Sequence, residues 1–228
     1  MKHVYYYDPT YILVIIGLII SLFASLRVNI TFKKYSKKQN TYRMTGAEAA
    51  SRILHAAGIN NITIKKISGS LTDNYNPMDK TLSLSDGVYD STSVAAIGVA
   101  AHECGHAIQD AYGYLPLKIR HMLVVPANIC SSLSWILVLL GLLFSSFSNL
   151  INIGIILFTV VVLFHLITLP VEINASTRAI KNLNVLGITN GEESRCVKKV
   201  LKAAAFTYLA SIVVALLQLI RLIKISNR

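Results

Sequence analysis

Two histidines and a glutamate stand close together in the sequence Ala-His-Glu-Cys-Gly-His-Ala at positions 101–107. His102 and His106 are four residues apart, so on a helix both imidazoles lie on one face and can aim at one point. Two such nitrogens supply half of a tetrahedral zinc site. Glu103 falls roughly 100° further round the helix, where it reaches a water at the metal better than the metal itself. The pattern H-E-x-x-H therefore predicts a catalytic zinc site with Glu103 as general base. The alternative is a pair of hydrogen-bonded core histidines.

The motif needs a helix, and residues 93–112 are predicted to form one. Ser93 and the two hydroxyl residues before it offer N-caps, and Gly113 stands where a helix stop is expected. The turns before the motif are apolar and mostly small, so we expect a buried helix with neighbouring backbone packed close. A polar motif in such a place requires a function or a full set of hydrogen bonds. Cys104 is expected to point away from the two histidines and to act as a small buried filler.

The composition is unlike that of a soluble protein, because 54% of the 228 residues are hydrophobic and only 14% are charged. The formal net charge of +11 lies largely in clusters near the apolar runs. Such flanks are typical of segments that face an anionic leaflet rather than nucleic acid. We therefore expect a multi-pass protein of the cell membrane, with the lipid bilayer and not nucleic acid as a partner. Four apolar runs are long enough to span or nearly span a bilayer, at 11–26, 124–147, 150–169 and 203–220.

The first apolar run has two interpretations. A cleavable signal peptide is one, with Ala24 and Ser25 as a processing site. The pair Asp8-Pro9 before the run and the basic series after it favour a transmembrane helix instead. Because basic flanks tend to stay in the cytosol, the following module and its active site are predicted to face the cytosol. The three cysteines show no paired spacing, so they indicate free thiols rather than a disulfide framework. The basic series comprises Arg27, Lys33, Lys34, Lys37, Lys38 and Arg43.

A small soluble module is predicted between the first run and the motif helix. Thr45 and Glu48 have capping-box spacing, and Gly58 supplies the stop of a first helix. Alternating residues predict one strand near 62–64, a second at 81–85 and a turn-rich loop between them. Together with the motif helix, these elements predict an αββα module.

The second predicted strand is a candidate for substrate binding. We expect it to be an edge strand that pairs with an extended substrate, so that backbone hydrogen bonds supply affinity with little side-chain preference. An ordinary interior strand is the alternative. Its residues are Thr81, Leu82, Ser83, Leu84 and Ser85.

Beyond the motif, the chain is expected to return twice through the membrane. Residues 116–121 are predicted to form a turn at the membrane edge, and a transmembrane hairpin follows with a polar break at 145–149. Pro170 is predicted to open a polar helix, as proline does at a first helical position. The predicted divisions are an N-terminal transmembrane helix (1–28), the module (29–122), the hairpin (123–169), the polar helix with an amphipathic lead (170–202), and a last transmembrane helix with a basic tail (203–228).

Three segments carry a resemblance to a known family: residues 76–85, the motif helix at 100–109, and Leu-Pro-Val-Glu-Ile-Asn-Ala-Ser at 169–176. With its arrangement of apolar runs, the chain resembles the YugP-like membrane zinc metallopeptidases over nearly its whole length. It is more distantly similar to the HtpX-like membrane peptidases. The resemblance implies a zincin-like module and one Zn²⁺ per chain, with Glu172 as a third ligand beside His102 and His106.

The residues around Glu172 carry further expectations. Ser176 stands where the HtpX-like group has an aspartate that supports the site; a serine can still hydrogen-bond a ligand histidine but brings no charge. Asn174 and Arg178 are candidates for stabilising an oxyanion. The acidic pair at 192–193 is the nearest rival of Glu172 as a ligand. In the alternative without a metal, the Glu172 carboxylate stabilises the N-terminus of its helix.

We therefore predict a mainly α-helical membrane protein with about four transmembrane helices and a small α+β metallopeptidase module. The expected activity is that of a zinc-dependent metalloendopeptidase, which hydrolyses peptide bonds in a protein or peptide substrate with a zinc-activated water and Glu103 as base. A non-catalytic zinc-binding scaffold or regulator is the second hypothesis, although a structural zinc site usually has four protein ligands and needs no Glu103. A transporter is the third. It requires ionisable residues in several spans, and His165 is the main one here.

Overall fold

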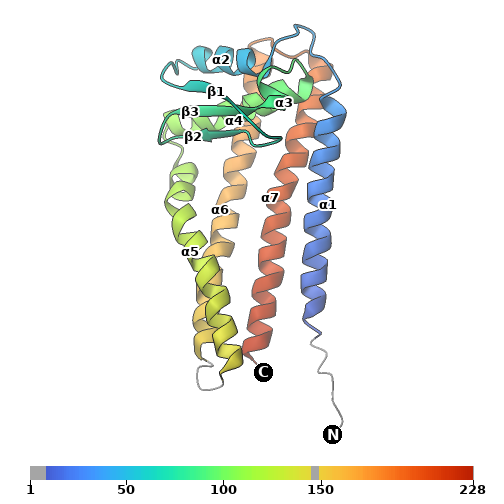
Figure 1. Ribbon diagram of the computed structural model, residues 1–228. Helices are drawn as coiled ribbons and strands as arrows, with labels where there is room; N and C mark the ends of the chain where they lie inside the picture. The colour runs from blue at the N-terminus through green and yellow to red at the C-terminus, as the bar shows by residue number, and fades with distance from the viewer. Residues whose placement is uncertain (1–8, 145–148, 228) are drawn as a thin grey trace.

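A computed structural model of the chain describes residues 9–144 and 149–227, and these are mostly helical. In Figure 1 the long helices run side by side, with a small sheet at one end of the bundle. The first long helix begins, and the last one ends, at the other end of the bundle. Among the described residues, four helices are long and apolar enough to cross a membrane: α1 (Tyr11–Tyr35), α5 (Leu115–Leu143), α6 (Asn149–Val185) and α7 (Gly191–Ser226).

Large apolar side chains cover the outside of these helices. Leu18 of α1 is 65% exposed and Ile156 of α6 is 66% exposed. Water would solvate such a surface poorly, whereas lipid chains cover it without cost. Helix α1 packs on α7, and α6 packs on both α5 and α7. The prediction of a mainly helical protein with four candidate membrane-spanning helices is therefore confirmed.

The elements at the sheet end of the bundle follow α1 in the chain. They are α2 (Gly46–Ala56), β1 (Thr63–Ile67), β2 (Asn74–Asn76), β3 (Thr81–Ser85), α3 (Asp86–Tyr89) and α4 (Val94–Ala111), which carries the motif. Their buried side chains form one core with residues of α6 and α7, among them Leu183 and Val197. This shared core fixes the motif helix against the long helices.

Local capping signals predicted two of these helices well. Thr45 and Glu48 form the capping box at the start of α2, and Gly58 follows its end with a φ of 71°. The Ser93 side chain caps α4 by accepting a hydrogen bond from the Ala96 N–H. Gly113 after α4 has a φ of 65°, a conformation that glycine adopts without strain.

The sheet differs from the prediction in its number of strands. Its order is β1-β3-β2, with β1 parallel and β2 antiparallel to β3. The third strand, β2, lies within residues that we predicted to be a loop. Turn-forming asparagines dominate it, but pairing with β3 holds them in extended backbone. The predicted αββα order therefore becomes one with three strands between the helices.

The prediction of an edge strand at 81–85 is wrong. Strand β3 is paired on both sides, so it has no free edge for a substrate. Its side chains also belong to the core, where Leu82 and Leu84 have no exposed surface. The alternating pattern of this strand therefore reflects the face that carries Leu82 and Leu84 into the core. The residues corrected are Thr81, Leu82, Ser83, Leu84 and Ser85.

The long helices continue through positions where we predicted boundaries. Pro170 lies inside α6 rather than at the start of a new helix, and α5 already includes the predicted turn at 116–121. The amphipathic lead and the last apolar run form one helix, α7. A proline is compatible with a long membrane helix because neighbouring helices and side chains satisfy the backbone group that it leaves free. The predicted break at 145–149 falls, except for Asn149, outside the described residues.

Candidate metal centre

Helix α4 approaches two of the long helices closely, and two glycines permit this contact. A Cβ on Gly105 would lie 2.5 Å from the backbone oxygen of Ala175 in α6, closer than any real contact. A Cβ on Gly98 would lie 3.1 Å from the Val197 side chain in α7. The expectation of small residues at a close backbone contact is therefore met. This contact brings the motif next to the segment of α6 that holds Glu172.

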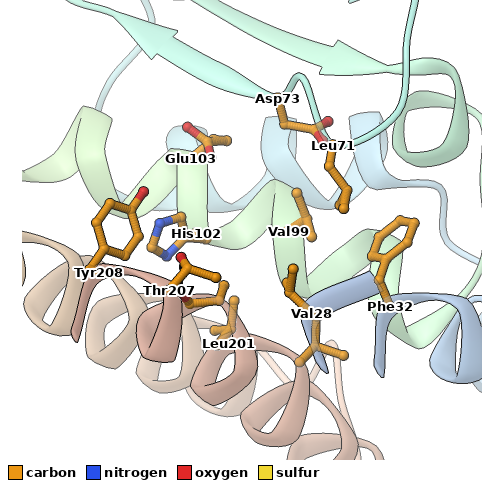
Figure 2. A pocket seen from close by; sticks show the side chains of 12 residues that line it. Val28, Phe32, Leu71, Asp73, Val99, His102, Glu103, Leu201, Thr207 and Tyr208 are labelled. Atoms are coloured by element: carbon orange, nitrogen blue, oxygen red, sulfur yellow. Dashed lines mark hydrogen bonds between the residues drawn. The ribbon is translucent and has the colours of Figure 1, made fainter. Parts of the chain in front are cut away.

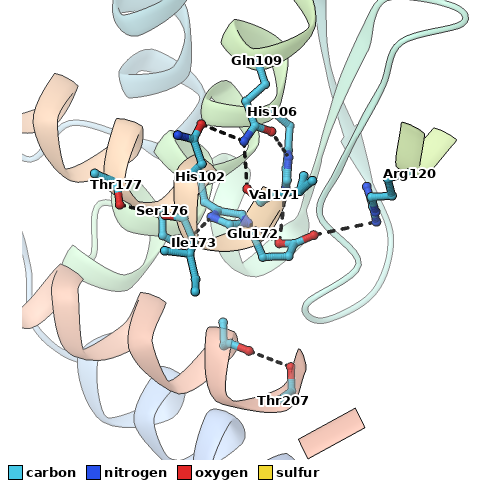
Figure 3. A network of polar contacts seen from close by, with 12 residues as sticks. His102, His106, Gln109, Arg120, Val171, Glu172, Ile173, Ser176, Thr177 and Thr207 are labelled. Atoms are coloured by element: carbon cyan, nitrogen blue, oxygen red, sulfur yellow. Dashed lines mark hydrogen bonds and ion pairs between the residues drawn. The ribbon is translucent and has the colours of Figure 1, made fainter. Parts of the chain in front are cut away.

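The structure brings His102, His106 and Glu172 together (Figure 3). The Nε2 atom of His102 lies 3.2 Å from Oε2 of Glu172, and Nε2 of His106 lies 3.5 Å from the same oxygen. The two imidazole rings are nearly perpendicular, with centroids 4.8 Å apart. Among the described residues, these three form the group of histidine, cysteine and acidic side chains whose ligand atoms could hold one metal ion.

The Nδ1 atoms of both histidines are engaged behind the cluster. His106 Nδ1 lies 3.0 Å from Oε1 of Gln109, and His102 Nδ1 lies 3.1 Å from Oγ of Ser176. The Gln109 amide is oriented by its nitrogen, which donates to the backbone oxygen of Val171. Its oxygen therefore accepts a hydrogen from His106 Nδ1, and this leaves the Nε2 lone pair for a metal.

The two distances from the histidines to Glu172 fit a zinc site, and all three ligand atoms lie within 4.8 Å of one another. Bond lengths of about 2.0–2.2 Å place the ligand atoms of a tetrahedral zinc site roughly 3.3–3.6 Å apart, close to the observed 3.2 and 3.5 Å. Three groups that all accept hydrogen bonds face one another here, and a cation between them removes their repulsion. Burial works to lower the pKa of His106, but its contacts with Glu172 and Glu103 raise this pKa overall. The site therefore attracts positive charge.

Glu103 lies beside the cluster and is not one of its three members. Burial raises the pKa of its carboxyl above the ordinary value, which makes the carboxylate a stronger base. Among the described residues, no protein group donates a hydrogen bond to this carboxylate. A buried polar group normally has a partner. A water or a substrate group in the adjoining pocket would supply one.

A polar pocket of about 130 Å³ opens onto these residues. It is lined by His102, Glu103, His106 and Glu172, and within the described part of the chain no fourth ligand closes the cluster. The other lining residues come from the β1–β2 loop, β2, α5 and α7. They are Asp73, Asn74, Tyr75, Leu117, Arg120, His121 and Tyr208.

Two functional candidates in this pocket were missed in the sequence. An Nη2 atom of Arg120 lies 3.8 Å from Oε1 of Glu172, the oxygen that faces away from the histidines. Tyr208 lines the pocket from α7 and stands near His102 and Glu103 in Figure 2. The signal for both was their polarity within or beside an apolar run. Nothing in their spacing ties them to the motif.

Asn174 and Arg178 lie elsewhere, which corrects their assignment as oxyanion candidates. The Arg178 Nε–H donates to Oδ1 of Asn174, 2.8 Å away, and the same oxygen accepts from Gln109. Neither residue lines the polar pocket. Residues two and six positions after Glu172 are rotated roughly 200° and 240° round the helix, whereas Ser176, four positions on, shares its face.

The rivals of Glu172 are also accounted for. Glu192 is exposed and pairs with Lys38, while Glu193 caps α7 and accepts hydrogen bonds from Thr41. Glu172 does not stabilise a helix N-terminus, because α6 begins at Asn149. The glutamate that reaches the two histidines is therefore Glu172.

The structure thus combines four candidate membrane-spanning helices with a buried His-His-Glu cluster that could hold a metal ion. Comparison with known families makes this specific. Residues 10–227 match the family described as "Putative neutral zinc metallopeptidase", and the chain belongs to that family. It is 43% identical over 213 residues to "Putative membrane protease YugP" of Bacillus subtilis (strain 168). The aligned region covers 93% of this chain and 94% of that protein. No solved structure matches the chain. The resemblance to the YugP-like family is therefore confirmed.

Proposed function

We propose that this protein is a membrane-embedded zinc metalloendopeptidase that cuts peptide bonds at the cytosolic surface of the membrane. The observation that carries the proposal is the open pocket, in which the buried Glu103 carboxylate stands beside three converging ligand atoms. Membership of a zinc metallopeptidase family supports the same reaction. We include in the proposal a zincin-like fold for the module formed by α2, the sheet and α4.

His102, His106 and Glu172 would hold one zinc ion, with Ser176 and Gln109 fixing the two imidazoles. When bound there, zinc polarises the scissile carbonyl and acidifies a water molecule. The Glu103 carboxylate would take a proton from a water molecule in the pocket as the water oxygen attacks the carbonyl carbon. Glu103 then passes the proton to the amine nitrogen as the carbon–nitrogen bond breaks.

Arg120 and Tyr208 are our candidates for stabilising the oxyanion that forms on the carbonyl. Both line the pocket that contains Glu103, and both carry hydrogen-bond donors. The guanidinium of Arg120 also faces the carboxylate of Glu172. This charge would hold the Glu172 side chain in place while its other oxygen faces the histidines.

A non-catalytic zinc scaffold remains the second candidate. Its site would gain nothing from an open pocket or from a buried glutamate beside the ligands. Metal analysis and casein cleavage with the purified protein separate the two functions. We expect about one zinc per chain and cleavage that a chelator abolishes and added zinc restores. One zinc per chain without any cleavage would favour the scaffold.

A further inference from the structure

A second cavity adjoins the candidate site and is lined mostly by apolar side chains. Its volume is about 220 Å³, and it lies between α1, α4 and α7. Figure 2 shows His102, Glu103 and Tyr208 at one end of this cavity and side chains of α1 at the other. Its apolar lining includes Val28, Phe32, Leu71, Val99, Leu201 and Ala204.

The apolar cavity and the polar pocket meet at the proposed general base. Both are lined by Asp73, His102, Glu103 and Tyr208. A peptide whose cleaved bond lies at Glu103 therefore has one neighbouring side chain within reach of the apolar cavity. The cavity therefore adjoins the candidate site through these shared residues.

The charges around the apolar cavity exclude acidic side chains. Among the described residues, no lysine or arginine lines it. Its carboxylates are those of Glu103 and Asp73, and Asp73 already accepts hydrogen bonds from the backbone N–H and hydroxyl of Ser85. An acidic side chain would meet like charge and no cationic side chain among the described lining residues, whereas an apolar side chain would replace water against a mostly apolar wall.

We propose that this cavity binds a bulky apolar side chain of the substrate, on one of the two residues that flank the cleaved bond. The inference rests on the proposed peptidase function and names its substrate class. An apolar cavity of roughly 150 Å³ is large enough for benzene, so about 220 Å³ accommodates the side chain of leucine, methionine or phenylalanine. Such a pocket discriminates between substrates by about 10–200-fold for each methylene group added to or removed from the side chain.

Two neighbouring alanines of α7 provide a matched test. Ala204 lines the apolar cavity, whereas Ala205 lines a different groove with Ile180 and Lys202. Ala204→Phe should fill the cavity, and Ala205→Phe should not touch it. Phe32→Ala, on the opposite wall, enlarges the cavity and serves as a second variant if Ala204→Phe does not fold.

The probe is a peptide library with a randomised central hexamer, incubated with full-length, zinc-loaded protein in detergent, and new termini are sequenced by mass spectrometry. For the unaltered chain we expect leucine, phenylalanine and methionine to exceed glycine and aspartate by about 10-fold or more at one flanking position. Ala204→Phe should reverse this preference in favour of small residues. Phe32→Ala should widen the preference to include tryptophan. Ala205→Phe should leave the preference unchanged.

The outcomes separate this inference from the proposed function. One outcome is that the unaltered protein cleaves and the Glu103→Gln control does not. If those cleavage sites show no apolar preference, the inference is overturned but the proposed peptidase function stands. An apolar preference that survives Ala204→Phe would overturn it as well. No Glu103-dependent cuts at all would overturn the peptidase itself and the inference with it.

Discussion

Glu172 completes the candidate metal cluster with the two motif histidines. It lies 66 positions beyond His106, with a helical hairpin between them, yet its carboxylate is buried beside both imidazoles. We expect Glu172→Ala to lower zinc affinity by more than the roughly 10–100-fold that loss of an outer hydrogen-bond partner costs, and to lower cleavage with it. Zinc titration against a competing chelator measures this. Glu192→Ala is the control, because that carboxylate pairs only at the surface. Full zinc binding by Glu172→Ala would exclude it as a ligand.

Ser176 tests the hydrogen bonds behind the ligands. Its hydroxyl contacts Nδ1 of His102, and it fills this role without the charge of an aspartate. Ser176→Ala should weaken zinc binding by about 10–100-fold without unfolding the protein. Thr177→Ala is a matched control, since the Thr177 hydroxyl bonds only to the backbone oxygen of Ile173. Equal zinc affinity in the two variants would mean that Ser176 does not orient the histidine.

At the residue scale, the sequence predicted what local spacing determines. His102, Glu103 and His106 occupy one helix, so their relative positions follow from helical geometry alone. The approach of Arg120 and Tyr208 depends instead on how α5 and α7 pack around α4, and no spacing in the chain encodes it. The same limit explains the misplaced role of Asn174 and Arg178, which share a helix with Glu172 but not a face.

The contact between α4 and α6 is the element on which the candidate site depends. In an ordinary helix interior, Gly→Ala is stabilising by roughly 0.5–1 kcal/mol. At Gly105 the added methyl would meet the Ala175 backbone oxygen, so we expect Gly105→Ala to destabilise by about 1–3 kcal/mol and to separate Glu172 from the histidines. Thermal unfolding and zinc content should fall together. Gly87→Ala, where a Cβ meets nothing within 4 Å, should lower neither. A Gly105→Ala protein with unchanged zinc content would show that the close contact is dispensable.

Caps and turns were predictable elements because their signals are local. The capping box of α2, the Ser93 cap of α4 and the glycine after each helix were all predicted correctly. Strand β2 was missed because its three residues favour turns and become a strand only by pairing with β3. The prediction of a helix start at Pro170 was wrong for a related reason. Proline occurs at a helix start and also inside a membrane helix whose neighbours satisfy the free backbone group, and only tertiary packing distinguishes the two.

The whole molecule places the candidate site and the basic loop after α1 at the same end of the bundle. The positive-inside tendency then predicts a cytosolic site, although it also places the basic end of α7 outside. We expect single cysteines at the exposed positions Lys37 and Glu192 to react only after permeabilisation, and one at Lys224 to react in intact cells. A Cys130→Ser background removes the native thiol that is not buried. Labelling of position 37 or 192 in intact cells would show that the protein has the opposite orientation in the membrane.

The central claim is that Glu103 acts as the general base of a zinc peptidase, and one variant tests it most directly. Glutamine keeps the shape of glutamate but cannot take a proton at neutral pH. Purified Glu103→Gln should therefore retain its zinc while its rate of peptide cleavage falls by about 10²–10⁴-fold relative to the unaltered protein. Zinc content and cleavage rate are measured on the same preparations. Undiminished cleavage by Glu103→Gln with full zinc content would contradict the mechanism.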